Sequence, residues 1–214
     1  MISMTLLLTL SGLIWQGQAV KPDIVRVAER FLPPNAELAE DYSFDYRRGQ
    51  VSRRWPAVLA AHVLGAESQD IVFAYYSPRV DTIGKTLFVS LLHFDGKDYE
   101  QVYEVSYRSQ VLFGPEGLRL LRLSDVHGDA LAVMAGIGAA LGGHLDVLVW
   151  RDPWGWENVF PPNGSQEYFY SLGHDGEMRI ALSAAHHPGA DNTPAPEPPP
   201  AWFRWDGKAF VKTQ

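Results

Sequence analysis

A turn pattern that occurs three times constrains the fold of this chain more than any other feature. An aromatic residue, a turn containing an acid, and a second aromatic residue follow one another in HFDGKDY (93–99), WRDPWGW (150–156) and WDGKAF (205–210). The leading aromatics Phe94, Trp150 and Trp205 are 56 and 55 residues apart. Each copy is typical of a β-hairpin whose two aromatics flank the turn and pack across it.

A second unit recurs upstream of each hairpin, in HVLGAESQDIVFA (62–74), DVHGDALAVMA (125–135) and SLGHDGEMRIALS (171–183). Each copy is a polar turn containing glycine that leads into an apolar run, and such runs predict β-strands. Recurrence at this length indicates supersecondary units that bury their faces against one another. We therefore predict an all-β fold of three degenerate four-stranded β repeats, about 56–107, 117–163 and 167–213, arranged as propeller-blade-like or stacked sheets. Whether the repeats close into a propeller is left open.

The N-terminal segment differs from the rest of the chain. Residues 1–19, MISMTLLLTLSGLIWQGQA, contain no charged side chain and end in a small-x-small pattern. This is typical of a signal peptide cleaved after Ala19, with an uncleaved anchor as the alternative. We expect a secreted or extracytoplasmic protein with no membrane span after cleavage.

Residues 20–55 are expected to form an N-terminal helix and a lead-in segment before a β-repeat domain, 56–214. PDIVRVAERFL (22–32) predicts one short helix, because Pro22 and Asp23 suit its first turn and its apolar residues share a face. Pro33 and Pro34 then stop it.

Composition narrows the possible partners. The 214 residues carry a formal net charge of −7, which argues against nucleic acid and anionic membranes as partners. The chain has no cysteine, which excludes disulfides, thiolate metal sites and a thiol nucleophile.

The two recurring units together resemble the repeats of secreted bacterial FG-GAP or VCBS-type proteins, which are relatives of the integrin α-subunit propeller. In that family the turn is typically Asp-x-Asp-Gly-Asp-Gly before an apolar strand, and it often binds calcium. The second copy matches at Asp125, Gly128 and Asp129, but has His127 in place of an acid and Ala130 in place of glycine. The third matches at Asp175 and Gly176 but has Ser171 and Gly173 in place of acids, and the first retains only Gly65.

We expect no cofactor, and the resemblance implies calcium at Asp125 and Asp129 as the alternative. Calcium takes six to eight oxygen ligands, and no single turn supplies more than two acids, so we favour a structural role for these turns. His127 and His174 with Asp125 or Asp175 offer zinc ligand types. They lie in different repeats without a short ligand spacing, so solvent-facing turn histidines are the favoured interpretation.

We expect a non-enzymatic binding or interaction module for a protein or glycan ligand at the cell surface. Aromatics at a loop tip are common contact residues, so Trp154 and Trp156 are candidates for the binding surface, with Asp175 and Glu177 in the third turn. The alternative is a secreted hydrolase or carbohydrate-active protein using acidic loop residues, for which the pairs Asp125/Asp129 and Glu37/Asp41 are available.

Overall fold

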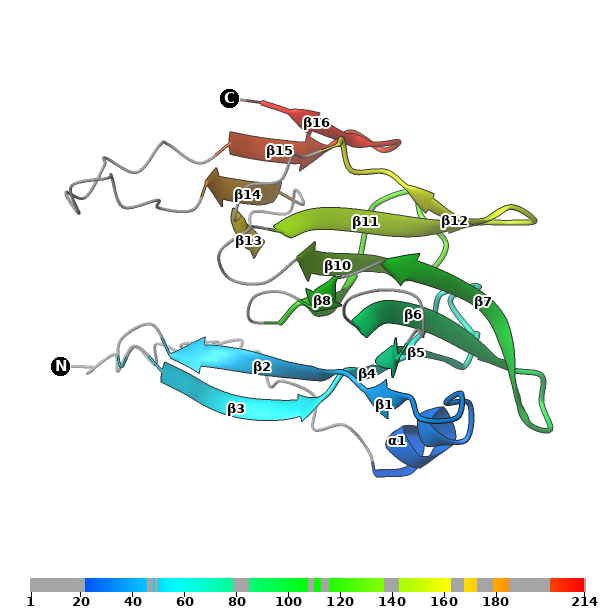
Figure 1. The fold of residues 1–214 in the computed structure, drawn as a ribbon. Coiled ribbons are helices and arrows are strands. Elements are labelled where there is room, and N and C mark those ends of the chain that lie inside the picture. Colours follow the sequence, from blue (N-terminus) through cyan, green and yellow to red (C-terminus); the bar gives the residue numbers. More distant parts are fainter. Residues whose placement is uncertain are drawn as a thin grey trace, which may run out of the picture.

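The computed structural model describes residues 22–45, 48, 50–78, 85–107, 110–112, 116–136, 143–162, 168–172, 179–184 and 201–213. The predicted all-β fold with one short helix is confirmed (Figure 1). The predicted signal segment, 1–19, lies outside the described residues.

The helix α1 (Pro22–Glu29) has an acid in its first turn, Asp23, where the negative charge complements the helix dipole. Its apolar face covers the outer side of the first sheet, with Ala28 fully buried and Ile24, Val25 and Val27 packed beside it. Among the described residues, no helix has the length and apolar character needed to cross a membrane.

Three antiparallel sheets form the body of the protein. The first has the order β1-β5-β6-β7 with β4 also on β5, and comprises β1 (Glu37–Leu38), β4 (Val58–Ala61), β5 (Asp70–Pro78), β6 (Lys85–Phe94) and β7 (Tyr99–Tyr107). The second has the order β12-β11-β10-β8 with β9 also on β10, and comprises β8 (Val111–Leu112), β9 (Leu118–Leu121), β10 (Ala130–Gly136), β11 (Gly143–Arg151) and β12 (Gly155–Asn158). The third comprises β13 (Tyr168–Leu172), β14 (Arg179–Ala184), β15 (Ala201–Trp205) and β16 (Phe210–Lys212) in chain order.

Each sheet therefore contains four antiparallel strands that follow one another in the chain, β4 to β7, β9 to β12 and β13 to β16. This confirms the prediction of three four-stranded repeats. A separate hairpin of β2 (Glu40–Asp45) and β3 (Gln50–Pro56) interrupts the lead-in segment between β1 and β4, and the sequence patterns did not predict it.

Strand register shows which positions of the first two repeats are equivalent. Ala61 pairs with Asp70 in the first repeat, and Leu121 pairs with Ala130 in the second, so equivalent residues there are 60 positions apart. Gly65 therefore corresponds to Asp125. Gly65 and Gly128, the glycines that the sequence pattern equates, do not occupy equivalent positions.

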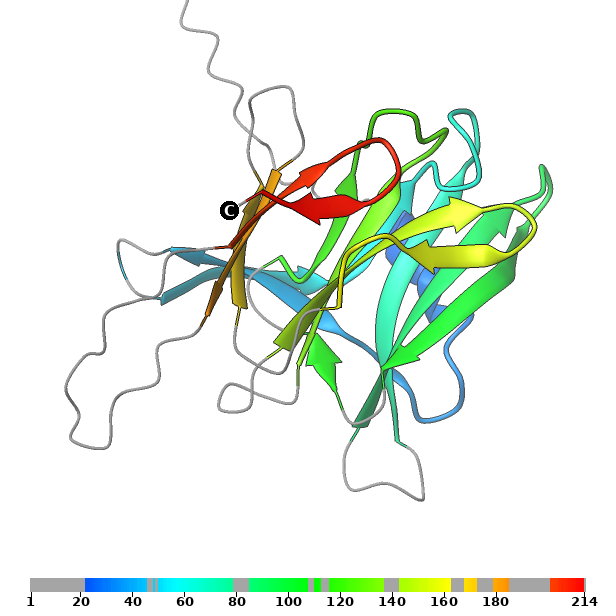
Figure 2. The same cartoon turned by 90° about the horizontal axis from the view of Figure 1, so that it is seen from above.

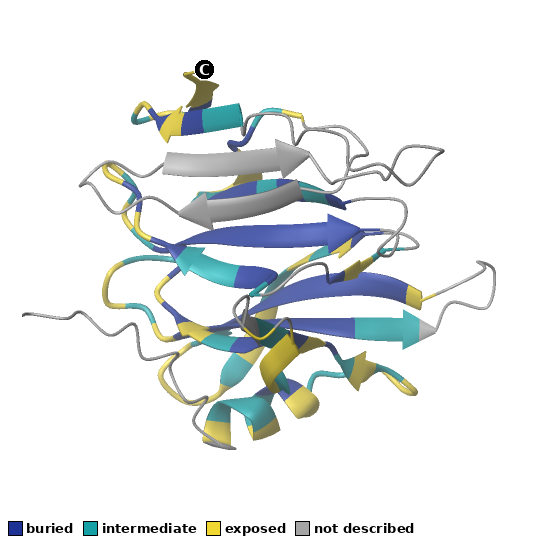
Figure 3. Ribbon diagram, turned by 90° about the vertical axis from the view of Figure 1, so that its left-hand side faces the viewer, coloured by how far each residue is buried: buried dark blue, intermediate teal, exposed yellow. Residues whose placement is uncertain are grey.

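The sheets stack on one another through alternating apolar residues. On β10, Leu131, Val133 and Ala135 belong to the core shared with the first sheet, whereas Ala132 and Met134 belong to the core shared with the third. The second sheet is thus covered on both faces, and Figure 3 shows its central strand as fully buried. Each fully buried Leu or Val side chain contributes about 1.5–3 kcal/mol, so this stacking is the main source of stability.

The aromatic hairpin turns β6–β7, β11–β12 and β15–β16 all lie along one side of the stack (Figures 1 and 2). The hairpin β2–β3 extends on the opposite side. None of the described sheets closes into a barrel.

Candidate functional site

The turn before β10, residues 124–129, contains both acids, Asp125 and Asp129, at which the family resemblance implies calcium. The Asp129 carboxylate accepts a hydrogen bond from the His62 backbone N–H through Oδ2 (2.8 Å) and pairs with Arg122 Nε through Oδ1 (3.0 Å). The Asp129 N–H donates in return to the His62 carbonyl (2.9 Å). With only 5% of its side chain exposed, Asp129 fastens the second repeat to the first.

Gly128 permits this close approach. A Cβ atom at position 128 would lie 2.4 Å from the carbonyl oxygens of both His62 and Val63, closer than a real side chain can come. The glycine is therefore required by packing between repeats, not by the geometry of its own turn.

The other side of the same turn contacts the third repeat. Trp205 Nε1 donates a hydrogen bond to the Ser124 carbonyl (2.9 Å). Asp125 is exposed, has a left-handed backbone (φ 63°), and its Oδ2 would lie 3.5 Å from a Cβ atom built on Gly207. The turn therefore joins all three repeats.

These contacts bear on metal binding at Asp125 and Asp129. Both oxygens of Asp129 already interact with protein donors, and a calcium ion would have to displace Arg122 or the His62 amide. The described part of the chain contains no group of three or more His, Cys, Asp or Glu side chains placed to hold a metal. His127 is exposed, whereas His174 and Asp175 lie outside the described residues.

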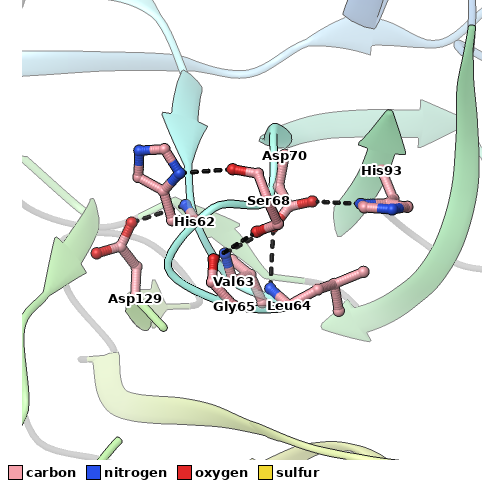
Figure 4. A network of polar contacts seen from close by, with 8 residues as sticks. All are labelled: His62, Val63, Leu64, Gly65, Ser68, Asp70, His93 and Asp129. Atoms are coloured by element: carbon pink, nitrogen blue, oxygen red, sulfur yellow. Dashed lines mark hydrogen bonds and ion pairs between the residues drawn. The ribbon is translucent and has the colours of Figure 1, made fainter. Parts of the chain in front are cut away.

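A buried carboxylate that the sequence patterns did not identify organises the equivalent turn of the first repeat (Figure 4). Asp70, whose side chain is fully buried, accepts hydrogen bonds through Oδ2 from the Val63 N–H (2.7 Å), the Leu64 N–H (2.9 Å) and the Ser68 hydroxyl (2.6 Å). Its Oδ1 accepts from His93 Nδ1 (2.8 Å). An acid at the first residue of a strand, two positions after a serine, is the only sequence signal for this network.

The Asp70 network contains a serine, a histidine and an aspartate, but they are not arranged for nucleophilic catalysis. In a Ser-His-Asp triad the histidine lies between the other two and takes the serine proton. Here Ser68 donates its hydroxyl directly to Asp70, and His93 bonds to the other carboxylate oxygen. The arrangement orders a turn and does not activate the serine.

The second acidic pair, Glu37 and Asp41, is also occupied by structural contacts. Asp41 is 1% exposed and accepts hydrogen bonds from the backbone N–H groups of Gly117 (3.0 Å) and Leu118 (3.1 Å). Burial raises the pKa of Asp41 above its usual value, and the backbone N–H donors oppose that rise. Glu37 forms an ion pair with Lys85.

The aromatics that flank each hairpin turn pack against each other, which confirms the predicted arrangement. The ring centroids are 5.2 Å apart for Phe94 and Tyr99, 5.8 Å for Trp150 and Trp156, and 5.5 Å for Trp205 and Phe210. The recurring aromatics are therefore packing units.

The turns of the first and third repeats share their backbone geometry. Asp95 Oδ1 accepts the N–H groups two and three residues ahead (2.7 and 2.9 Å), and Asp206 Oδ1 does the same (2.9 and 2.8 Å). Gly96 and Gly207 both have φ 96°. The backbone hydrogen bonds lower the pKa of both aspartates.

The turn of the second repeat carries the two candidate tryptophans in different environments. Trp154 is 84% exposed at the tip. Trp156 is half-buried, and its ring meets that of Trp150 edge-on. Asp175 and Glu177, the other candidates for the binding surface, lie outside the described residues.

The Trp154 turn is firmly held at its base. Gly155 is buried with φ 90°, and a Cβ atom there would lie 2.6 Å from the Tyr103 ring of the first sheet. The Trp154 N–H donates to the Arg151 carbonyl (2.6 Å), and Arg151 Nε pairs with Glu157 (2.9 Å).

Comparison of the chain with family models finds no match, and no curated protein or solved structure shows significant similarity to it.

Proposed function

We propose that this chain is an exported, non-enzymatic binding module whose contact surface includes Trp154. The observation that carries the proposal is the 84% exposure of the Trp154 side chain at the tip of the β11–β12 turn. Exposing a large aromatic ring to water is unfavourable, and a partner that covers it recovers that free energy. Tryptophan is also among the residues most often found to dominate binding energy.

The rigidity of the turn supports a contact role. Gly155 lies against Tyr103, the Arg151–Glu157 ion pair closes the two strands, and Trp156 packs on Trp150. A contact residue held in place before binding loses less conformational entropy when the complex forms.

A tryptophan ring suits two kinds of ligand, an apolar pocket on a protein or the face of a sugar ring. We propose a protein or glycan ligand at the cell surface or in extracytoplasmic space. Its location rests on the uncharged leucine-rich segment 1–19, which is typical of a signal peptide. Asp175 and Glu177 of the third repeat remain candidates for the same surface.

The test compares Trp154→Ala with a matched control, Val211→Ala, which also shortens an exposed apolar side chain (37% exposed) but on the third sheet. The full chain is screened against a glycan array and a library of surface-protein ectodomains. We expect Trp154→Ala to weaken binding of the recovered ligand at least tenfold, which corresponds to about 1.4 kcal/mol or more of binding free energy. Val211→Ala should bind like the unsubstituted protein.

Two results would overturn the proposal. Ligand binding that Trp154→Ala leaves unchanged would remove the turn from the contact surface. Hydrolysis of a glycan or ester panel that is lost in Asp125→Asn or Asp129→Asn would establish an enzyme, and the acidic-loop alternative would replace the binding module.

A further inference from the structure

The hairpin β2–β3, residues 40–56, is here called the arm. Strand β3 is exposed at every residue from Gln50 to Arg54, although alternate residues of a strand point to opposite faces. Both faces of this part of the arm are therefore solvated. In Figure 1 the arm extends away from the stacked sheets, on the side opposite to the aromatic turns.

An isolated two-stranded hairpin is marginally stable in water, so the base of the arm needs support. Asp41 supplies it, because its buried carboxylate accepts the N–H groups of Gly117 and Leu118 at the start of β9. The Glu116 N–H donates to the Tyr42 carbonyl (2.7 Å) beside it. The arm is thus fixed where the first two repeats meet, while its outer part is left uncovered by the described residues.

The arm carries four arginines and three acids, Glu40, Asp41 and Asp45, and its positive charge is concentrated in one run. The run RRGQVSRR, residues 47–54, holds four of the 18 lysine and arginine residues and no acid. Outside this run the chain has fourteen basic and 25 acidic residues, which gives a formal charge of −11. A concentrated positive charge on an acidic protein attracts anionic groups at short range.

Two arginines of the arm lie over aromatic rings. The Arg53 guanidinium is 5.9 Å from the Trp55 ring centroid, and the Arg54 guanidinium is 6.0 Å from that of Tyr42. A guanidinium stacked on a ring keeps its N–H edge available for a carboxylate. Arg54 has an exposed ion pair with Glu40 (3.4 Å), whereas Arg53 has no ion-pair partner among the described residues.

The positions of these arginines indicate the shape of the partner. Arg53 and Arg54 are consecutive residues of one strand and so project from opposite faces of the arm. A membrane presents a plane and would contact one face, whereas a polypeptide can pass over both. We propose that the arm binds an acidic segment of a partner protein, whose carboxylates contact Arg53 on one face and Arg54 on the other. This inference is independent of the proposed function at Trp154.

The experiment measures binding of the full chain to a fluorescent 16-residue peptide of alternating glutamate and serine, at 50 and 300 mM salt. We expect Arg53→Ser/Arg54→Ser to weaken binding at least tenfold at low salt. The matched control, Lys97→Ser/Lys208→Ser, removes two positive charges from exposed turns elsewhere and should bind like the unsubstituted protein. Trp154→Ala should also bind normally, which separates this result from the outcome at the turn.

The same variants are tested for binding to vesicles containing phosphatidylglycerol and for self-association by sedimentation. Equal peptide binding by the arginine variant, or an equal loss in the lysine control, would overturn the proposal. So would loss of only vesicle binding, which would assign the arm to a lipid surface, or loss of only self-association, which would assign it to a second copy. Circular dichroism of each variant checks that the sheets remain folded.

Discussion

The turn of the third repeat and the turn of the second repeat show how one packing unit supports two different tips. Both are closed by a pair of aromatics, Trp205 with Phe210 and Trp150 with Trp156. In the third repeat four residues separate the pair, and Asp206 holds the backbone. In the second, five residues separate the pair, and an exposed tryptophan occupies the tip.

The difference shows which part of the turn is free to change. The aromatic pair belongs to the core and is retained, because removing it would open the packing between sheets. The tip makes few contacts, so a residue that suits a partner can replace one that suits the fold. Substitutions in the aromatic pair, at the turn glycines and aspartates, and at the exposed tip test this division.

Trp150→Ala should have the largest effect. The Trp150 ring packs edge-on against both Tyr103 of the first sheet and Trp156 of its own turn. Truncation should lower the free energy of unfolding by about 3 kcal/mol, near the lower end for a packed aromatic because the residue is half-buried. Urea denaturation followed by far-ultraviolet circular dichroism measures it. A loss below about 1 kcal/mol would show that the aromatic pair is not a core element.

Gly155→Ala should cause the next largest loss in the free energy of unfolding, and Gly207→Ala should cause a smaller one. Both positions have positive φ, which costs a non-glycine residue about 1–2 kcal/mol. At Gly155 the new methyl group would also overlap the Tyr103 ring, whereas at Gly207 it would lie in ordinary contact with Asp125. We expect losses of about 2–3 and about 1 kcal/mol in urea denaturation.

A double variant separates the two causes at Gly155. Tyr103→Ala removes the ring that the new methyl group would overlap. In a protein that already carries Tyr103→Ala, Gly155→Ala should therefore lower the free energy of unfolding by less than it does alone. Full additivity would show that the loss comes from backbone strain alone.

These contacts show why the sequence predicted some features and not others. The aromatic pairs and the four-stranded repeats were predictable because each depends on residues close together in the chain. The Asp70 network joins the turn before β5 to His93 on β6, and no local sequence pattern encodes that contact. The sequence did not predict the arm, because Arg53 and Arg54 break the apolar alternation that identifies a half-buried strand.

The equivalence assumed for Gly65 and Gly128 was wrong for a similar reason. The sequence comparison equated two residues because both are glycine. Strand register instead makes Gly65 of the first repeat equivalent to Asp125 of the second. Position 128 requires glycine because it lies against the backbone of His62 in another repeat. Only the three-dimensional arrangement reveals that requirement.

Asp206→Asn should have a smaller effect that depends on pH. The N–H groups of Ala209 and Lys208 lower the Asp206 pKa in the folded protein. The charged carboxylate therefore stabilises the fold above its unfolded pKa, near 3.9, and this contribution is lost as the pH falls through the folded value. Asparagine keeps an acceptor oxygen but removes the charge.

The Asp206→Asn variant should thus have a lower Tm than the unsubstituted protein at pH 7, and the difference should shrink toward pH 2.5. Asp95→Asn should behave alike, because the first repeat has the same turn. The second repeat has Arg151 at this position and offers no equivalent acid. A Tm difference that is constant with pH would show that the aspartate charge does not hold the turn.

Trp154→Ala should have the smallest effect on stability, within about 0.5 kcal/mol, because a side chain that is 84% exposed buries little surface on folding. Trp156→Ala, two residues away, should cost about 2 kcal/mol or more, since it breaks the edge-on contact with Trp150. Urea denaturation of the two variants under one set of conditions measures the contrast. If Trp154→Ala destabilised the protein as much as Trp156→Ala, its ring would be part of the packing, and the tip would not be free to serve a partner. If Trp154→Ala is as stable as the unsubstituted protein, the Trp154 ring does not serve the fold and is available to contact a partner.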